Sequence, residues 1–193
     1  RERIDDLASF AATTAPRIDL EELSPLAGAE LLRRLGVDGT AEELRAASAE
    51  FGGHALALTL LGNYLRKARG GDVRCRREVP LGKASARQGG HAYRVIAAYE
   101  RWLGTGSELG ILRLLGLFDR PAPLEAIAAL RAAPVLPGLT ESLTELSEDD
   151  WQWALSSLRE HGLLAPTSSG AGVVDAHPLV RSYFADQLRE QHP

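Results

Sequence analysis

The chain contains no methionine and a single cysteine, Cys75, among its 193 residues. One cysteine excludes an internal disulfide framework and is typical of a protein kept in a reducing compartment, so we expect a cytoplasmic location. Methionine is absent even from position 1. We therefore expect the chain to be a segment of a longer protein that contains further functional parts.

Aromatic residues make up only 6% of the chain, and valine and isoleucine are scarce beside leucine and alanine. This balance favours helices over sheets. No apolar stretch is long enough to cross a bilayer, so we expect no membrane contact. An excess of basic residues is also lacking. The formal net charge is −4, which argues against a dedicated nucleic-acid binder.

Apolar residues at helical spacing, separated by caps and glycines, predict a helical bundle within residues 1–103. Thr40 and Glu43 form a capping box at the start of one helix. The helix that follows Gly53 is apolar on nearly all sides and is expected at the buried centre of the bundle. Residues 69–90 are rich in glycine and arginine and poor in apolar side chains, which predicts a mobile, basic loop.

The pattern of residues 107–191 is three helices, two short strands and a last helix. The strand signals at 163–165 and 173–175 flank a Ser-Ser-Gly-Ala-Gly turn and predict a β-hairpin. This order is the plan of a winged-helix domain over residues 104–193, with the helix of Trp151 in the recognition position. The expected fold class is therefore mainly α, with a helical bundle followed by a winged helix that contains one small β-hairpin.

Motifs for catalysis are missing from the sequence. It contains no phosphate-binding G-x-x-x-x-G-K-[ST] loop, no zinc-spaced histidine pair with acidic or cysteine partners, and no Gly-x-Ser-x-Gly elbow. We therefore expect this chain to have no catalytic residues, no metal site and no enzymatic activity of its own.

The helix in the recognition position is acidic, with Glu148, Asp149, Asp150 and Glu160 against a single Arg159. Such a helix repels phosphate, and the predicted wing carries no lysine or arginine, so we expect no nucleic-acid binding. We interpret the two tryptophans of this helix, Trp151 and Trp153, as packing residues rather than base readers.

Two segments place backbone N–H groups at predicted helix starts, where anions bind. One is Gly53-His54-Ala55-Leu56-Ala57-Leu58, and the other is Asp175-Ala176-His177-Pro178-Leu179-Val180-Arg181. His177 adds a side-chain donor whose charge depends on pH. The alternatives are a simple helix cap at His177 and a partly buried, hydrogen-bonded histidine at His54.

These two segments resemble motifs of the NB-ARC/STAND signalling ATPases, and the stretch from Leu20 to Gly36 is similar to bacterial members in particular. The segment from Gly53 is similar to the Gly-x-Pro-Leu-Ala-Leu stretch of the helical ARC subdomain. The segment around His177 is similar to the Met-His-Asp-type motif of the winged-helix subdomain, with Pro178 in place of the aspartate. The order of the predicted helices also agrees, so the resemblance covers nearly the whole chain.

The resemblance implies that ADP or ATP is held by a P-loop domain that precedes this chain in the same polypeptide. It implies that His177 contacts the β-phosphate of ADP, that Gly53, His54 and Ala55 stand near the nucleotide, and that Arg1 belongs to a sensor segment. It also implies effector and helical-repeat domains in the parent protein, and a homo-oligomer on activation. No tight binding of nucleotide to this chain alone is expected.

The resulting hypothesis is a regulatory lid that senses the bound nucleotide and controls an open–closed switch for oligomerisation and signalling. Two hypotheses from other classes stay open. One is a winged-helix transcriptional regulator. The other is a protein-interaction scaffold in which the basic residues 70–90 dock an acidic partner.

Overall fold

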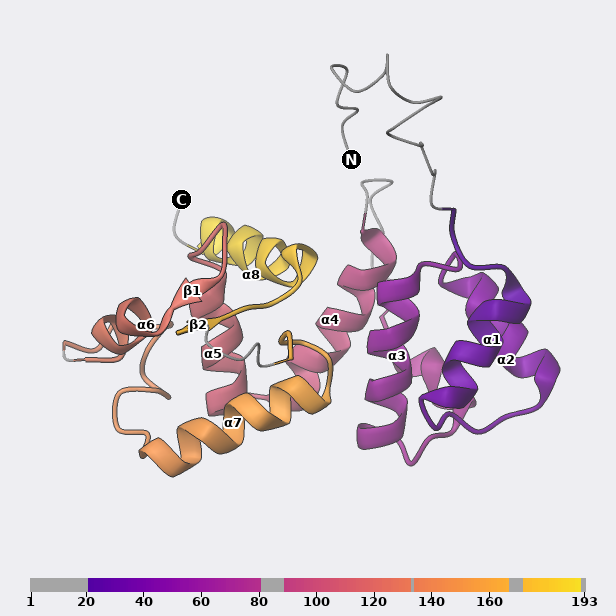
Figure 1. The fold of residues 1–193 in the computed structure, drawn as a ribbon, viewed down its shortest axis with the longest axis horizontal. Helices are drawn as coiled ribbons and strands as arrows, with labels where there is room; N and C mark the ends of the chain where they lie inside the picture. Colours follow the sequence, from indigo (N-terminus) through magenta and orange to yellow (C-terminus); the bar gives the residue numbers. More distant parts are fainter. Residues whose placement is uncertain (1–20, 81–88, 133, 167–171, 192–193) are drawn as a thin grey trace, which may run out of the picture.

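The computed structural model describes residues 21–80, 89–132, 134–166 and 172–191. It is mainly helical with a small antiparallel sheet, as predicted (Figure 1). Local caps set the helix starts: Ser24 accepts the Ala27 N–H at 3.2 Å. Thr40 and Glu43 form the expected capping box. The first elements are α1 Pro25–Arg34, α2 Ala41–Glu50, α3 Ala55–Ala68, the 3₁₀ helix η2 Val73–Glu78 and α4 Gly90–Leu103.

Helix α3 is the buried centre of this first part, as its apolar sequence predicted. Most of its residues from Ala57 to Leu65 are buried. It packs on α1 and η2, and most extensively on α4. Contacts between α3 and α4 advance in the same direction, because Gly52, just before α3, lies against His91 in the first turn of α4, and Tyr64 meets Tyr99 nearer the carboxyl ends of both helices. The two helices therefore run parallel and begin at the same end.

The prediction of a mobile loop over residues 69–90 is wrong for its first half. Asp72 forms a parallel β-bridge with Asp38, and η2 follows it directly. Val73 and Val79 are buried at the two ends of η2, so two isolated apolar side chains anchor a segment that is otherwise basic. Residues 81–88 of the predicted loop lie outside the described residues.

Arginines of this segment are paired with acids rather than simply solvated. Arg69 contacts Glu78 at 2.6 Å, and Arg76 contacts Glu50 at 2.9 Å. The sequence showed the arginines as a basic run, but it did not show that their carboxylate partners come from α2 and from the end of η2. Because these carboxylates neutralise part of the positive charge of the segment, the hypothesis that it docks an acidic partner is weakened.

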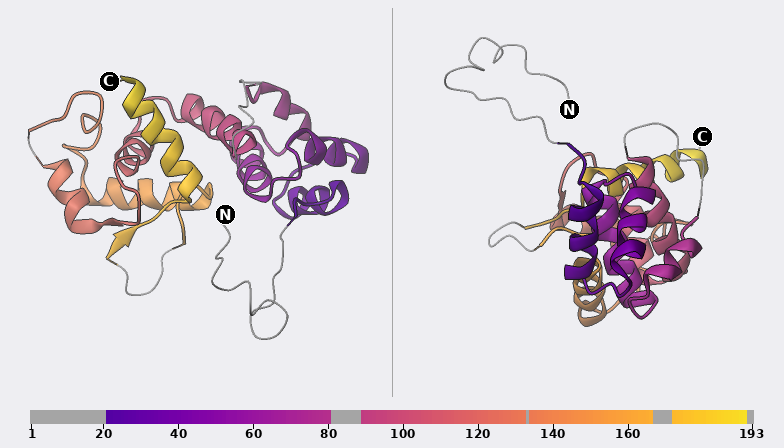
Figure 2. Two further views of the ribbon diagram at one scale, coloured as in Figure 1. Left: turned by 90° about the horizontal axis from the view of Figure 1, so that it is seen from above. Right: turned by 90° about the vertical axis from the view of Figure 1, so that its right-hand side faces the viewer.

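The second part contains the expected order of helices and a sheet with one additional strand. Its elements are α5 Ser107–Leu115, β1 Ala122–Pro123, α6 Leu124–Arg131, α7 Glu148–Glu160, β2 Val173–Val174 and α8 Pro178–Gln191. Figure 1 shows α1, α2 and α3 on one side of α4, and α5 to α8 with the sheet on the other. The left view of Figure 2 shows the same division, and the buried apolar side chains of both parts form one continuous cluster.

The predicted hairpin is present as a short ladder, and it gains a partner that the sequence did not reveal. Leu164 and Ala176 form an antiparallel bridge, and the Ala165 N–H donates to the Asp175 carbonyl at 2.8 Å. Strand β2 also pairs with β1 in antiparallel register, with Ala122 opposite Val174. The turn predicted between the two strands lies largely outside the described residues.

The interpretation of Trp151 and Trp153 as packing residues holds for only one of them. Trp151 is buried, and the Arg131 guanidinium lies over its ring at 4.1 Å. Trp153 keeps 64% of its surface exposed. It stands off the buried stripe of α7, which contains Trp151, Ala154, Leu155 and Leu158.

Candidate functional site

The start of α3 depends on a glycine that no other residue could replace without strain. Gly53 has φ +66°, and a Cβ at this position would lie 2.1 Å from the Leu23 carbonyl oxygen. Its own carbonyl accepts the Leu23 N–H at 2.9 Å. The next residue, His54, is half-buried and caps α3, because its Nδ1 accepts the Ala57 N–H at 3.3 Å. Ala55 follows as the exposed first residue of the helix.

The start of α8 exposes His177. Its Nδ1 accepts the Leu179 N–H at 3.1 Å, in the manner of a helix-capping side chain. Because Nδ1 accepts, the neutral ring carries its proton on Nε2, and Nε2 is then the donor nitrogen. The capping role that we gave as the alternative for His177 is therefore present. It uses Nδ1 and orients the ring, and it leaves the Nε2–H group as a donor.

Arg181 fixes the segment that leads to His177. It is only 9% exposed, and its Nη1 pairs with the Asp175 carboxylate and donates to the Ala176 carbonyl. Its Nη2 donates to the Asp119 carbonyl at 3.4 Å, on the chain before β1. A planar guanidinium that holds several acceptors at once sets their relative positions. The residues on both sides of His177 are thus tied to each other and to the sheet.

The first turn of α4 connects the starts of α3 and α8. A Cβ on Gly89 would lie 2.7 Å from Leu179 Cδ2, and a Cβ on Gly52 would lie 2.9 Å from His91 Nε2. Figure 1 places the upper end of α4 between α3 and α8. The segments that contain His54 and His177 are therefore brought to one face through α4. Each helix start contributes a partial positive charge to this face.

His91 also lies at this face, although the sequence did not lead us to expect it among the site residues. Its Nδ1 is buried and has no hydrogen-bond partner within the described ranges. Burial lowers the pKa of His91, and the nearby Arg94 and His54 lower it further. A signal was present, because Gly-Gly-His occurs twice, at Gly52-Gly53-His54 and at Gly89-Gly90-His91. Each copy stands at the start of one of the two parallel helices.

Arg94 supports this face from one turn further along α4. Its guanidinium lies over the Phe51 ring at 4.7 Å, and its Nη2 is 3.6 Å from Glu50 Oε1. Its Nε donates to the Pro80 carbonyl at 3.0 Å. Of the remaining residue expected at the site, Arg1, nothing is described, because residues 1–20 lie outside the described ranges.

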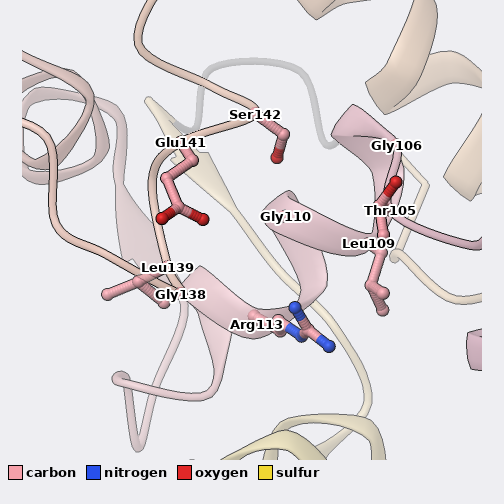
Figure 3. A pocket seen from close by; sticks show the side chains of 9 residues that line it. All are labelled: Thr105, Gly106, Leu109, Gly110, Arg113, Gly138, Leu139, Glu141 and Ser142. Atoms are coloured by element: carbon pink, nitrogen blue, oxygen red, sulfur yellow. The ribbon is translucent and has the colours of Figure 1, made fainter.

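A cavity of about 370 Å³ lies away from all the predicted site residues (Figure 3). The start of α5 and residues 138–142 line it, and it includes Arg113 and Glu141. A second hollow of about 300 Å³ is bordered by Pro178 and Arg181, beside the segment of His177. We place the candidate site at the converging helix starts and not at the cavity of Figure 3, because none of the predicted site residues lines that cavity.

Over the described ranges, no group of three or more His, Cys, Asp or Glu residues is placed to hold a metal ion. None of the helices described is long and apolar enough to cross a membrane. Neither a protein-family model nor a curated protein sequence matches this chain significantly.

Proposed function

We propose that this chain is the regulatory lid of an NB-ARC/STAND-type signalling ATPase. In this proposal α1 to α4 form the helical subdomain and α5 to α8 form the winged-helix subdomain. A P-loop domain in the same polypeptide holds ADP or ATP, and the face formed by the starts of α3, α4 and α8 covers the nucleotide. The observation that carries the proposal is that the start of α4 packs beside both motif-like segments, which are far apart in sequence: His91 lies against Gly52, and Gly89 lies against Leu179.

The chemistry of this face fits a phosphate group. The helix starts place positive partial charge at this face, which favours an anion. The first-turn N–H groups of α8 are already paired, because the Leu179 N–H donates to His177 Nδ1 and the Val180 N–H donates to the His177 carbonyl, so the donor at this helix start is the His177 side chain. His177 adds an exposed imidazole that the backbone of α8 orients through Nδ1. Under the proposal, His177 Nε2 donates to the β-phosphate, and Gly53, His54 and Ala55 approach the nucleotide from the start of α3.

A lid of this kind acts by differential contact. Nucleotide state shifts an open–closed equilibrium only where the nucleotide touches the lid differently in the two states. A hydrogen bond from His177 that exists only in the closed, ADP-bound state supplies such a difference. Its loss favours opening, oligomerisation of the parent protein and output by its effector, in the cytoplasm.

The winged-helix architecture does not favour DNA binding here. The solvent-facing side of α7 carries Glu148, Asp149, Asp150 and Glu160, all exposed. A recognition helix with this charge meets phosphate repulsion instead of releasing counterions from DNA. The proposal therefore treats the winged helix as a part of the lid.

The test is the dissociation rate of ADP from the full-length parent carrying His177→Ala. Loss of a charge-assisted hydrogen bond of about 1.5–3 kcal/mol predicts an off-rate raised by about tenfold or more, together with signalling without stimulus. His177→Asp keeps a capping acceptor but repels phosphate, so it should release ADP at least as fast. Ser147→Ala is the matched control, because Ser147 caps α7 in the same way but lies on a different helix. Equal off-rates for His177→Ala and Ser147→Ala would contradict the proposal.

A further inference from the structure

A second candidate site lies at the opposite ends of α3 and α4. A cleft of about 290 Å³ opens there between these helices and the carboxyl end of α7. Its lining includes Lys67, Trp102, Trp153, Glu160 and His161, together with two serines of α7. The cleft thus joins the two parts of the chain, and it is separated from the proposed nucleotide face by the length of α3.

Two of the three tryptophans of the chain line this cleft and remain exposed. Trp153 is 64% exposed and Trp102 is 38% exposed. Trp102 is held in place by edge contacts, with ring centroids 5.1 Å from His161 and 6.3 Å from Tyr64. Large aromatic side chains left in solvent on a rigid support are typical of protein interfaces, where tryptophan and arginine are enriched.

Acidic side chains lie close to the cleft. Glu160 stands at its rim, whereas Glu148, Asp149 and Asp150 are in the first turn at the other end of α7, about 15–18 Å along the helix from Glu160. Glu108 lies behind the cleft and accepts from the Ser157 hydroxyl at 3.4 Å. The lining cation, Lys67, is already paired with Glu160 at 2.6 Å. Burial lowers the pKa of His161, so the imidazole adds no positive charge near neutral pH.

We propose that this cleft binds an arginine side chain of a basic protein partner. Tryptophan is the strongest cation–π acceptor among the side chains, and arginine is its commonest cation. Lys67 contacts Glu160 through Oε2, and Oε1 has no hydrogen-bond partner within the described part of the chain. A guanidinium stacked on Trp153 can donate to that oxygen while its flat face covers the indole. The partner is a polypeptide and not a nucleic acid, because the acidic side of α7 repels phosphate.

The test titrates the ¹⁵N-labelled chain with the peptide acetyl-Gly-Arg-Gly-Arg-Gly-amide and follows the indole N–H signals by NMR. We expect the Trp102 and Trp153 signals to shift and the signal of the buried Trp151 to stay. The same peptide with citrulline for arginine keeps the shape but loses the charge, and should bind about tenfold more weakly. Equal binding of the citrulline peptide would overturn the proposal.

Variants locate the binding. Trp153→Ala and Glu160→Gln should each lower the affinity for the arginine peptide by about fivefold to tenfold. Glu145→Gln is the control, because it removes one exposed negative charge outside the cleft. If it weakens binding as much as Glu160→Gln does, the attraction is only general electrostatics and the proposal fails. Circular dichroism checks the fold, and Trp153→Phe, which keeps an aromatic ring, should retain part of the binding.

A second copy of the chain is the competing occupant. Sedimentation equilibrium of the wild type and of Trp153→Ala separates the two: a dimer that Trp153→Ala dissociates would overturn the partner proposal. None of these outcomes bears on the nucleotide lid, because the cleft and the proposed nucleotide face share no residue.

Discussion

The carbonyl of His161 joins the end of α7 to the helices of the first part, and it offers a sharp test of how the two parts are held together. Asn63 Nδ2 donates to this oxygen at 3.0 Å, and the single proton of the Tyr99 hydroxyl is shared between this oxygen and the Leu60 carbonyl, each at 3.2 Å. The three residues are buried, with His161 5% exposed and Asn63 7% exposed. We predict that removing both donors destabilises the chain by more than the sum of the single removals.

The magnitude follows from what each change leaves behind. Tyr99→Phe removes one neutral hydrogen bond, which contributes about 1 kcal/mol to the free energy of unfolding. Asn63→Ala removes another and leaves a small void, which costs about 1–2 kcal/mol. After either change the His161 carbonyl still has one donor. After both it is buried without any, and an orphaned buried acceptor costs about 1–3 kcal/mol. We therefore expect a coupling of about 1–2 kcal/mol beyond additivity.

The measurement is urea unfolding of the wild type, both single variants and the double variant, followed by circular dichroism. Ser24→Ala and Ser147→Ala form the control pair, because they cap two separate helices, α1 and α7, and share no partner. Their losses, about 1 kcal/mol each, should add. A coupling below about 0.5 kcal/mol for Asn63 and Tyr99 would refute the reasoning, because it would show that water replaces the lost donors and that the joint is not sealed.

Two further predictions concern pH and glycine. Burial lowers the pKa of His161 below its ordinary value of 6.5, so below that pH the unfolded chain binds more protons than the folded chain. The contribution of His161 to the free energy of unfolding should therefore be fully present above pH 6.5 and be lost as the pH falls below it. His161→Gln should reduce the slope of unfolding free energy against pH between about 5 and 6.5, where carboxylates contribute little and where His91, whose pKa burial also lowers, accounts for the slope that remains. An unchanged slope would contradict the assignment. Gly53→Ala should cost more than about 2 kcal/mol in urea unfolding, because it combines left-handed backbone strain with a Cβ 2.1 Å from the Leu23 carbonyl oxygen. Gly70→Ala, at φ +62° with open space around it, should show only the strain, about 1 kcal/mol, and equal losses would contradict the clash.

Local patterns predicted most of the helices because their signals lie within a few residues. The capping box at Thr40, the acidic first turn of α7 and the all-round apolar character of α3 each specify an element without tertiary information. Strand β1 could not be predicted in this way. It consists of Ala122 and Pro123, and it exists because β2, some fifty residues later, pairs with it. The segment around η2 was missed because two buried valines outweigh a basic composition.

The tryptophans of α7 show where a pattern was present but not fully used. The stripe through Trp151, Ala154, Leu155 and Leu158 already excludes Trp153 from the buried side of the helix. The size and apolar character of indole suggested packing for both residues. Helical spacing was the stronger evidence, and the exposed position of Trp153 follows from it.

The candidate site was likewise predictable only in part from the sequence. His54 and His177 could be selected because a helix start is a local feature with a known affinity for anions. That these starts meet at one face could not be predicted, since the contact runs through Gly89 and Leu179, which are about ninety residues apart and carry no sequence signal for each other. His91 could have been found from the repeated Gly-Gly-His.

The two proposed sites stand at opposite ends of the same pair of parallel helices, and this arrangement limits how one site could influence the other. Helix α4 is also tied to α8, because Glu100 accepts from the Tyr183 hydroxyl and from Gln187 Nε2, each at 2.7 Å. Rigid helices alone do not couple the two sites. Binding in the cleft can affect the nucleotide face only if the partner binds the open and closed states with different affinity. The element that can differ is the joint at His161, because it lines the cleft and also holds α7 against α3. If a basic partner weakens that joint on binding, it favours the open state and speeds the loss of ADP. Linkage then requires that ADP weaken the binding of the partner by the same factor.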